Sequence, residues 1–236
     1  IIKEKYSLLN NKTNHYILNL ENFKKICKKY NVTISEYLTA LYAYAIYKTI
    51  YDKSSNKEIV INVPIDLRKH YKIESFSNFF TCMDIQVNIS NNKNISFNKI
   101  LNQVHKEFEK KLTLENIKKY LSRDVKLGTN IIIRIIPLCI KKKLMKYISK
   151  ITTKTTTTLS NIGQIKIDEP YKSYIDNIMV LASVGINQKV KCTICSYENN
   201  LTITINSNLL KNNLEEEFYN LLIKYVGKVK LESNKI

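Results

Sequence analysis

The segment EIVINVPI, Glu58–Ile65, decides the fold class of this chain. Its β-branched and apolar side chains fall on both faces of an extended chain, which is typical of a strand in the centre of a sheet and covered on both sides. Pro64 is expected to end the strand, because proline has no N–H to donate to a neighbouring strand. A second strand is expected at Asn78–Asn88, where Thr81, Met83 and alternate residues form one apolar face.

Helical patterns surround this central strand. Thr33 and Glu36 have the spacing of a capping box, and the apolar residues after them recur at helical intervals, which predicts a long, mostly buried helix at Ile34–Tyr51. Ser96 is expected to cap another helix, with Phe97 on its apolar face. The remaining expected helices are Glu21–Tyr30, Leu114–Leu127, Ile135–Ile151 and Leu214–Lys230.

Strand-like segments lie at both ends of the sequence. Those at the carboxyl end follow a threonine-rich, β-prone stretch, Thr152–Thr158, that runs into Leu159–Gly163. A turn at Asn199-Asn200 would join the last two as a hairpin. The expected strands are His15–Leu20, Ile175–Val184, Lys189–Tyr197 and Leu201–Asn206. Since no repeat or Gly/Ser/Pro-rich linker divides the chain, residues 1–236 are expected to form one α/β domain with a mixed sheet flanked by helices.

The chain is strongly basic, with a net charge of +18 over 236 residues. Such a charge suits nucleic acid, an anionic membrane or a phosphorylated ligand. However, Lys occurs together with abundant Asn, Ile and Tyr, a composition that AT-rich codons produce, and no nucleic-acid recognition motif accompanies it. Lys141-Lys142-Lys143 would suit CoA phosphates or an anionic membrane face, but the sequence favours a solvated helix face.

Cysteine usage indicates a reducing compartment and no metal site. The five cysteines are spread through apolar stretches rather than arranged in a disulfide framework. Cys192 and Cys195 form a lone CxxC in an expected strand, where their odd separation directs them to opposite faces. No second pair completes a zinc site. Free, buried thiols fit a reducing cytosol, so the chain is expected to be cytoplasmic. No signal peptide is expected, and Ile1 is expected to be a cut site inside a longer chain.

Several motifs resemble those of a known family. Thr33–Tyr42 reads T-x-x-E-Y-L-x-A-L-Y, and Ile61–Arg68 reads I-x-V-P-I-D-L-R. Ser77-Asn78-Phe79-Phe80 and Ser160-Asn161-Ile162-Gly163 follow in order. Nearly the whole chain resembles the second half of clostridial alcohol-acetyltransferase-like proteins, which belong with condensation domains to the chloramphenicol-acetyltransferase-like superfamily. The resemblance implies a CoA-dependent acyltransferase of two lobes, of which this chain would be the C-terminal one.

The resemblance also implies a mechanism. In the family, an HHxxxD motif in the first lobe supplies the base, which takes the proton from a hydroxyl or amine that attacks a thioester. This chain lacks the motif: its nearest segments are Lys69-His70-x-x-x-Glu74 and His105-x-x-x-Glu109. No catalytic residue is therefore expected in this chain. The expected partners are an N-terminal lobe, an acyl-CoA or carrier-protein thioester as donor, and a small alcohol or amine as acceptor. No tightly bound cofactor is expected.

Five residues carry the expected site. Arg68 is expected to form a structural ion pair with the Asp of HHxxxD, since a guanidinium stays charged and grips a carboxylate bidentately. Asn78, Ser160, Asn161 and Gly163 are expected to line the tunnel between the lobes. The alternatives are local: a solvated Arg, a turn-capping Asn, and a β-bulge at the glycine.

Two other functions remain open at this point. A lone lobe would expose its inter-lobe face, so it could act as a non-catalytic scaffold that self-associates through that face. The positive charge also leaves open a basic nucleic-acid or membrane-surface binder.

Overall fold

A mixed sheet runs through the whole molecule. The computed structural model describes residues 2, 5–9, 11–52, 54, 57–75, 77–89, 94–152, 155–210 and 213–234, so Ile1, the expected cut site, lies outside it. Within the described residues the sheet has seven strands in the order β3-β2-β4-β5-β6-β1-β7, and only the β2–β4 and β4–β5 pairs are parallel. The strands are β1 (Lys12–Asn19), β2 (Ile59–Asp66), β3 (Phe80–Val87), β4 (Thr157–Ile165), β5 (Val190–Tyr197), β6 (Asn200–Ser207) and β7 (Lys230–Ser233).

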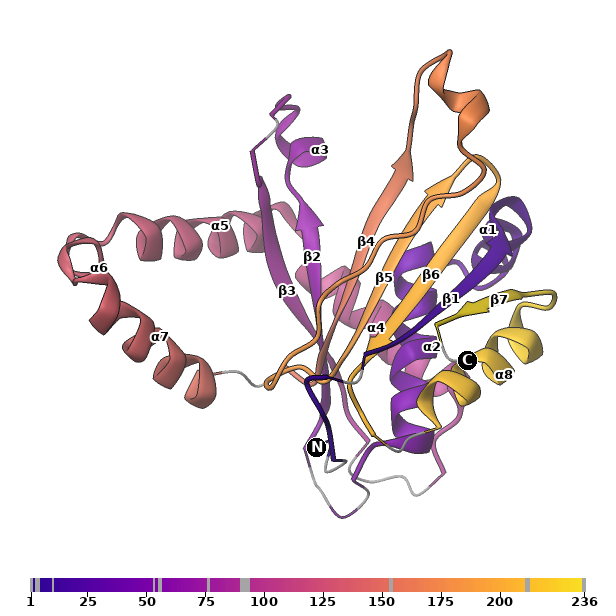
Figure 1. Ribbon diagram of the computed structural model, residues 1–236, viewed down its shortest axis with the longest axis horizontal. Helices are drawn as coiled ribbons and strands as arrows, with labels where there is room; N and C mark the ends of the chain where they lie inside the picture. The colour runs from indigo at the N-terminus through magenta and orange to yellow at the C-terminus, as the bar shows by residue number, and fades with distance from the viewer. Residues whose placement is uncertain are drawn as a thin grey trace.

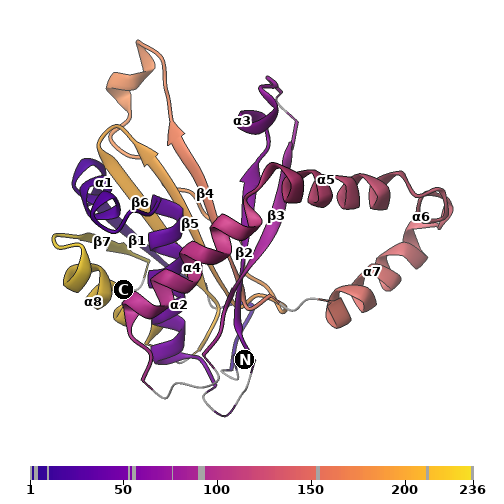
Figure 2. The same cartoon turned by 180° about the vertical axis from the view of Figure 1, so that it is seen from behind.

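Helices cover one face of this sheet, and three more extend away from its β3 edge (Figures 1 and 2). The covering helices are α1 (Leu20–Lys29), α2 (Ile34–Thr49), α4 (Phe97–Lys111) and α8 (Leu214–Tyr225). The projecting helices are α5 (Leu114–Thr129), α6 (Ile131–Ile135) and α7 (Leu138–Thr152). Short helices α3 (Arg68–Tyr71) and η1 (Tyr171–Tyr174) lie in the loops after β2 and β4. The predicted α/β fold with a mixed, helix-flanked sheet is therefore confirmed.

Helix α2 is the centre of the core. Its predicted capping box is present: Glu36 Oε2 accepts from the Thr33 N–H at 2.6 Å, and Thr33 Oγ1 accepts from the Glu36 N–H at 3.2 Å. Most of α2 is buried between the sheet and the neighbouring helices, as its alanines and apolar residues predicted. The Tyr37 ring meets Phe23 of α1 and Phe97 of α4 edge-on, which locks these three helices together.

Strands β2 and β3 pair antiparallel, and β2 lies one residue later than the predicted strand Glu58–Ile65. The alternation on β3 holds, with Thr81 and Met83 buried and Phe80 exposed. Pro64 lies inside β2 rather than at its end. The strand continues because pairing with β3 extends to Asp66, whereas pairing with β4 stops at Asn62.

The predicted strand Ile175–Val184 is wrong. These residues form no strand; they cross the face of the sheet opposite the covering helices (Figure 1). Side chains of β5 and β6 hold the segment by its carbonyls: Thr193 Oγ1 donates to Val180 O, and Asn206 Nδ2 donates to Ala182 O at 3.1 Å. Its apolar residues thus cover a sheet face instead of joining an edge, and a short apolar run is typical of both arrangements.

Three element boundaries also differ from prediction. The β5–β6 hairpin turns at Glu198 and Asn199, because Asn200 already pairs with Tyr197 in the ladder. The closing helix stops at Tyr225, where Gly227 (φ +108°) ends it, and the chain then forms β7. The helix predicted from Ile135 begins only after Pro137, as α7. Helix α7 extends to Thr152, and β4 starts at Thr157.

Candidate functional site

The predicted site residues lie in the loop between β2 and β3 (Arg68 and Asn78) and inside β4 (Ser160, Asn161 and Gly163). The parallel neighbours β2 and β4 pair only through Ile61↔Thr157 and Asn62↔Thr158, and beyond that point the strands diverge toward their carboxyl ends (Figure 1). In open α/β sheets, ligands bind outside the carboxyl ends of parallel strands where neighbouring connections diverge. The two ends therefore form a candidate site.

Arg68 holds together the loop that follows β2. It is the first residue of α3, and its Nε donates to Ser75 O at 2.8 Å while Nη2 donates to Ser77 O at 2.7 Å. Nη1 lies 3.0 Å from Asp66 Oδ1 in an ion pair, and the Arg68 side chain remains 37% exposed. The guanidinium is thus fixed in direction by two carbonyls and still has an open side. Its predicted pairing with a carboxylate of another lobe remains a prediction.

Asn78 lies beside this loop, one residue after the carbonyl that Arg68 Nη2 contacts and two residues before β3 begins. Its side chain is exposed. The structure therefore brings Asn78 and Arg68 to the same end of the β2–β3 hairpin, and the tunnel-lining role of Asn78 stays a prediction.

Asn161 and Gly163 form a β-bulge in β4. Asn161 Nδ2 donates to Ser35 Oγ at 2.9 Å, which ties β4 to the first turn of α2. Asn161 Oδ1 accepts from the Gly163 N–H at 2.9 Å, and the ladder with β5 shifts register between Asn161 and Gln164. Gly163 has a φ of +86°, a value that side chains with a Cβ rarely adopt. The bulge that the sequence left as an alternative is present. Ser160 precedes it and is half-buried opposite Thr193.

Replacing Gly163 by alanine is expected to lower the free energy of unfolding by about 1–2 kcal/mol, because left-handed backbone disfavours a Cβ. A Cβ at Gly163 would meet no atom within 4 Å, so the loss would come from the backbone rather than from a clash. Urea unfolding measures it. Gly128→Ala in helix α5 is the matched control and is expected to leave stability unchanged or raise it. Equal effects at both positions would contradict the assignment of strain to Gly163.

The three histidines lie on separate elements, and two of them contact polar side chains of other elements. His105 Nδ1 is 2.9 Å from Glu36 Oε1, and its Nε2 is 3.6 Å from Glu109 Oε1. The predicted Glu109 contact is thus the weaker of two. Glu36 was missed as a partner because it lies far away in sequence. His15 Nδ1 is 2.8 Å from Thr204 Oγ1, and burial lowers the pKa of its imidazole. His70 is exposed on α3.

The CxxC pair behaves as a buried structural feature. Cys192 packs in the core, whereas Cys195 Sγ lies 3.3 Å from Ile178 O on the opposite face, as the odd spacing predicted. Burial raises the pKa of both thiols, so both stay protonated near neutral pH. Among the described residues, no three His, Cys, Asp or Glu side chains gather as a metal site would require.

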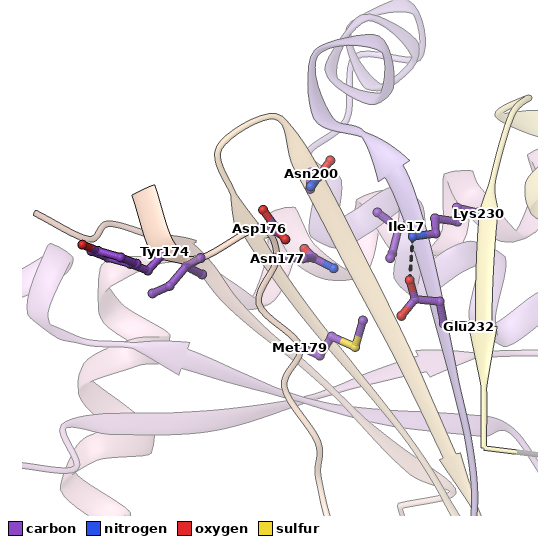
Figure 3. Close-up of a pocket in the computed structure, with 9 residues that line it drawn as sticks. Ile17, Tyr174, Asp176, Asn177, Met179, Asn200, Lys230 and Glu232 are labelled. Atoms are coloured by element: carbon purple, nitrogen blue, oxygen red, sulfur yellow. Dashed lines mark ion pairs between the residues drawn. The ribbon is translucent and has the colours of Figure 1, made fainter. Parts of the chain in front are cut away.

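A pocket of about 830 Å³ lies away from the predicted site, between residues 174–179 and strands β1, β6 and β7 (Figure 3). Asn177 Oδ1 accepts from Thr202 Oγ1 at 3.2 Å. At the opposite wall Lys230 and Glu232 pair at 2.8 Å. The sequence did not indicate this pocket, because it depends on residues 175–184 crossing the sheet and on the unpredicted strand β7.

Comparisons with known proteins match this chain by structure only. No protein-family model matches, and no curated protein matches by sequence. The epimerization domain from the third module of tyrocidine synthetase B aligns with 96% of this chain at a TM-score of 0.57 and 10% identity. The TRI3 trichothecene 15-O-acetyltransferase from Fusarium sporotrichioides aligns with 95% of this chain, at a TM-score of 0.58 and 11% sequence identity. The wax ester synthase/diacylglycerol acyltransferase from Marinobacter aquaeolei VT8 aligns with 94% of this chain, at a TM-score of 0.51 and 13% sequence identity.

The chain has the fold of a condensation-domain lobe. The chain spans about half the length of the solved structures it matches: 49% of the epimerization domain, 49% of the acetyltransferase and 52% of the wax ester synthase. The predicted fold family, condensation domains and chloramphenicol-acetyltransferase-like acyltransferases, is thereby confirmed at the level of the fold.

The helices of this chain show whether it could cross a membrane. Within the part of the chain that the structure describes, none of them combines the length and apolarity that crossing a bilayer requires.

Proposed function

We propose that this chain is the C-terminal lobe of an acyltransferase that moves an acyl group from a thioester to a hydroxyl or amine, as an alcohol O-acetyltransferase does. One observation supports the proposal most directly: nearly all of this chain aligns with each neighbour, but only about half of each neighbour is covered. Two of those neighbours are named for acyl transfer: a trichothecene 15-O-acetyltransferase and a wax ester synthase/diacylglycerol acyltransferase. The donor would be an acyl-CoA or a carrier-protein thioester, and the acceptor a small alcohol or amine.

The base for this reaction would come from a second lobe. An imidazole titrates near neutral pH, so it can take the acceptor's proton as the hydroxyl or amine attacks the thioester carbonyl. Neither of the two histidines in the segments that most resemble HHxxxD, His70 and His105, suits the role of this base. Both ring nitrogens of His105 lie near carboxylates, Nδ1 at 2.9 Å from Glu36 and Nε2 at 3.6 Å from Glu109, and His70 is exposed on the short helix α3. The HHxxxD motif is absent from the sequence.

Arg68 would align that second lobe. Its guanidinium is aimed by the Ser75 and Ser77 carbonyls, and its open side can grip the Asp carboxylate of HHxxxD. The exposed ion pair with Asp66 is a weak competitor, since two solvated side chains gain little from pairing. Arg68 is therefore a positioning residue in this proposal: it holds the loop that carries the base.

Residues of β4 and the start of β3 would line the acceptor path. The Asn161 side chain already hydrogen-bonds to Ser35 and to the Gly163 N–H, so it would shape the path without contacting the substrate. Ser160 is half-buried and Asn78 is exposed, so their polar groups remain available to an acceptor or to the oxygen that gains charge during attack. No step requires a tightly bound cofactor, and the setting would be cytoplasmic.

The gene region that precedes the Ile1 codon tests this proposal. We expect it to encode a lobe with HHxxxD, and the chain produced with that lobe should acetylate small alcohols from acetyl-CoA. Replacing the second His of the motif with alanine should abolish turnover while leaving the folded protein intact by circular dichroism. A gene without such a lobe, or turnover that survives the substitution, would refute the proposal.

A further inference from the structure

Helices α5, α6 and α7 form an arm that projects from the β3 edge of the sheet (Figures 1 and 2). Only the base of the arm is packed: Ile117 of α5 is 1% exposed, and Asp124 accepts a hydrogen bond from Thr81 Oγ1 of β3 at 2.8 Å. None of the residues of α6 is buried. The outer arm is thus a helical surface without support from the rest of the described chain.

Large apolar side chains are concentrated on this unsupported part. Single exposed apolar residues are ordinary on protein surfaces, whereas a contiguous group marks a surface that binds something. The exposed fractions are 71% for Ile131, 73% for Ile132, 75% for Ile135, 65% for Leu138, 56% for Ile140, 40% for Leu144 and 64% for Tyr147.

The apolar residues of α7 follow a helical face. Ile140, Leu144 and Tyr147 recur at i, i+4 and i+7, so they form one stripe along the helix. Lys142, two positions after Ile140, lies on the opposite side and is exposed. The helix therefore carries an exposed apolar stripe with an aromatic residue and has Lys142 on the opposite side, features that helices lying in a membrane interface share.

The charge of this region favours an anionic partner. Between Val125 and Ile167 the sequence carries nine basic residues and no acidic one. Lysine is depleted in the centres of protein–protein interfaces, whereas clusters of Lys and Arg beside an apolar helix face are attracted to anionic lipid headgroups. The sequence alone favoured a solvated face for Lys141–Lys143; the exposed apolar stripe beside them changes that interpretation.

We propose that the arm binds the surface of an anionic membrane, with the apolar residues of α6 and α7 at the boundary between headgroups and acyl chains. The arm lies on the bilayer without crossing it, since no described helix is long and apolar enough to span one. This binding involves no thioester, so it is tested without measuring acyl transfer.

Vesicle flotation tests the proposal. The chain should float with vesicles of phosphatidylcholine and phosphatidylglycerol, and much less with phosphatidylcholine alone, and added salt should weaken the charge-dependent part. Absence of flotation with the anionic vesicles at low salt would overturn the proposal, as would equal flotation with both compositions.

Two sets of variants locate the binding surface. Lys142→Gln with Lys143→Gln should weaken partitioning about 25-fold, at about fivefold per lysine near an anionic surface. Ile131→Gln, Ile132→Gln and Ile135→Gln together should weaken it about a hundredfold. The matched control is Lys28→Gln with Lys29→Gln, which removes two exposed charges at the end of α1 and should leave flotation unchanged. Circular dichroism verifies that each variant is folded.

The variants also distinguish a membrane from a protein partner. If a second copy of this chain covers the arm, the isoleucine variants should convert a dimer to a monomer in sedimentation experiments and leave flotation unchanged. That result would overturn membrane binding, as would an equal loss of flotation in the α1 control.

Discussion

Replacing Arg68 by alanine is expected to lower kcat/KM for acyl transfer about a hundredfold in the protein that contains both lobes, because a catalytic loop displaced by about 1 Å loses that much rate. The substitution removes two hydrogen bonds to the Ser75 and Ser77 carbonyls and the proposed ion pair to the other lobe. It should cost the isolated chain only about 1–2 kcal/mol in the free energy of unfolding, since the Arg68 side chain is partly exposed.

Two controls separate this positioning role from a purely structural one. Arg68→Lys keeps the charge but cannot bridge both carbonyls and a carboxylate, so its kcat/KM should lie between those of the wild type and Arg68→Ala. Added guanidinium ion should partly restore turnover in Arg68→Ala by occupying the vacated site. If Arg68→Ala loses stability but keeps full kcat/KM, Arg68 only closes its own loop and the proposed ion pair does not exist.

Replacing Phe97 by alanine is expected to destabilise the chain by about 3–5 kcal/mol, because a large buried ring leaves a cavity that the surroundings fill only in part. Phe97 is 2% exposed, and its ring centroid lies 4.6 Å from that of Tyr225 and 5.3 Å from that of Tyr37. One side chain thus joins α4 to α2 and to the end of α8. Urea unfolding with a constant m-value measures the loss.

Phe80→Ala is the matched control for Phe97. Phe80 lies on β3 and is 52% exposed, so the same chemical change should cost less than about 1 kcal/mol there. Equal losses at the two positions would mean that the helical layer is not packed through Phe97.

Local chemistry explains which parts of the fold could be predicted from the sequence. Helix α2 was predicted from Thr33, Glu36 and the apolar spacing after them, all of which act within a few residues. The segment 175–184 was predicted wrongly because its run of apolar residues is typical both of a strand in a ladder and of an extended segment lying across the sheet. Its actual anchors, Thr193 and Asn206, are distant in sequence.

The candidate site was predictable to a similar extent. The sequence motifs placed Arg68 and Asn78 correctly in the loop between β2 and β3, whereas Ser160–Gly163, expected at a strand end, lie inside β4. The contacts that fix Arg68 and Asn161 could not be predicted, because they depend on the path of a loop and on the approach of Ser35 from another element.

The requirement for a base from another lobe is tested most directly by incubating this chain alone with acetyl-CoA and a small alcohol and measuring ester by mass spectrometry. The account predicts ester at the level of the protein-free control across the neutral pH range. Ester formation above that control, lost on replacing His70 or His105 by alanine, would show that this chain carries its own catalytic base and would contradict the account.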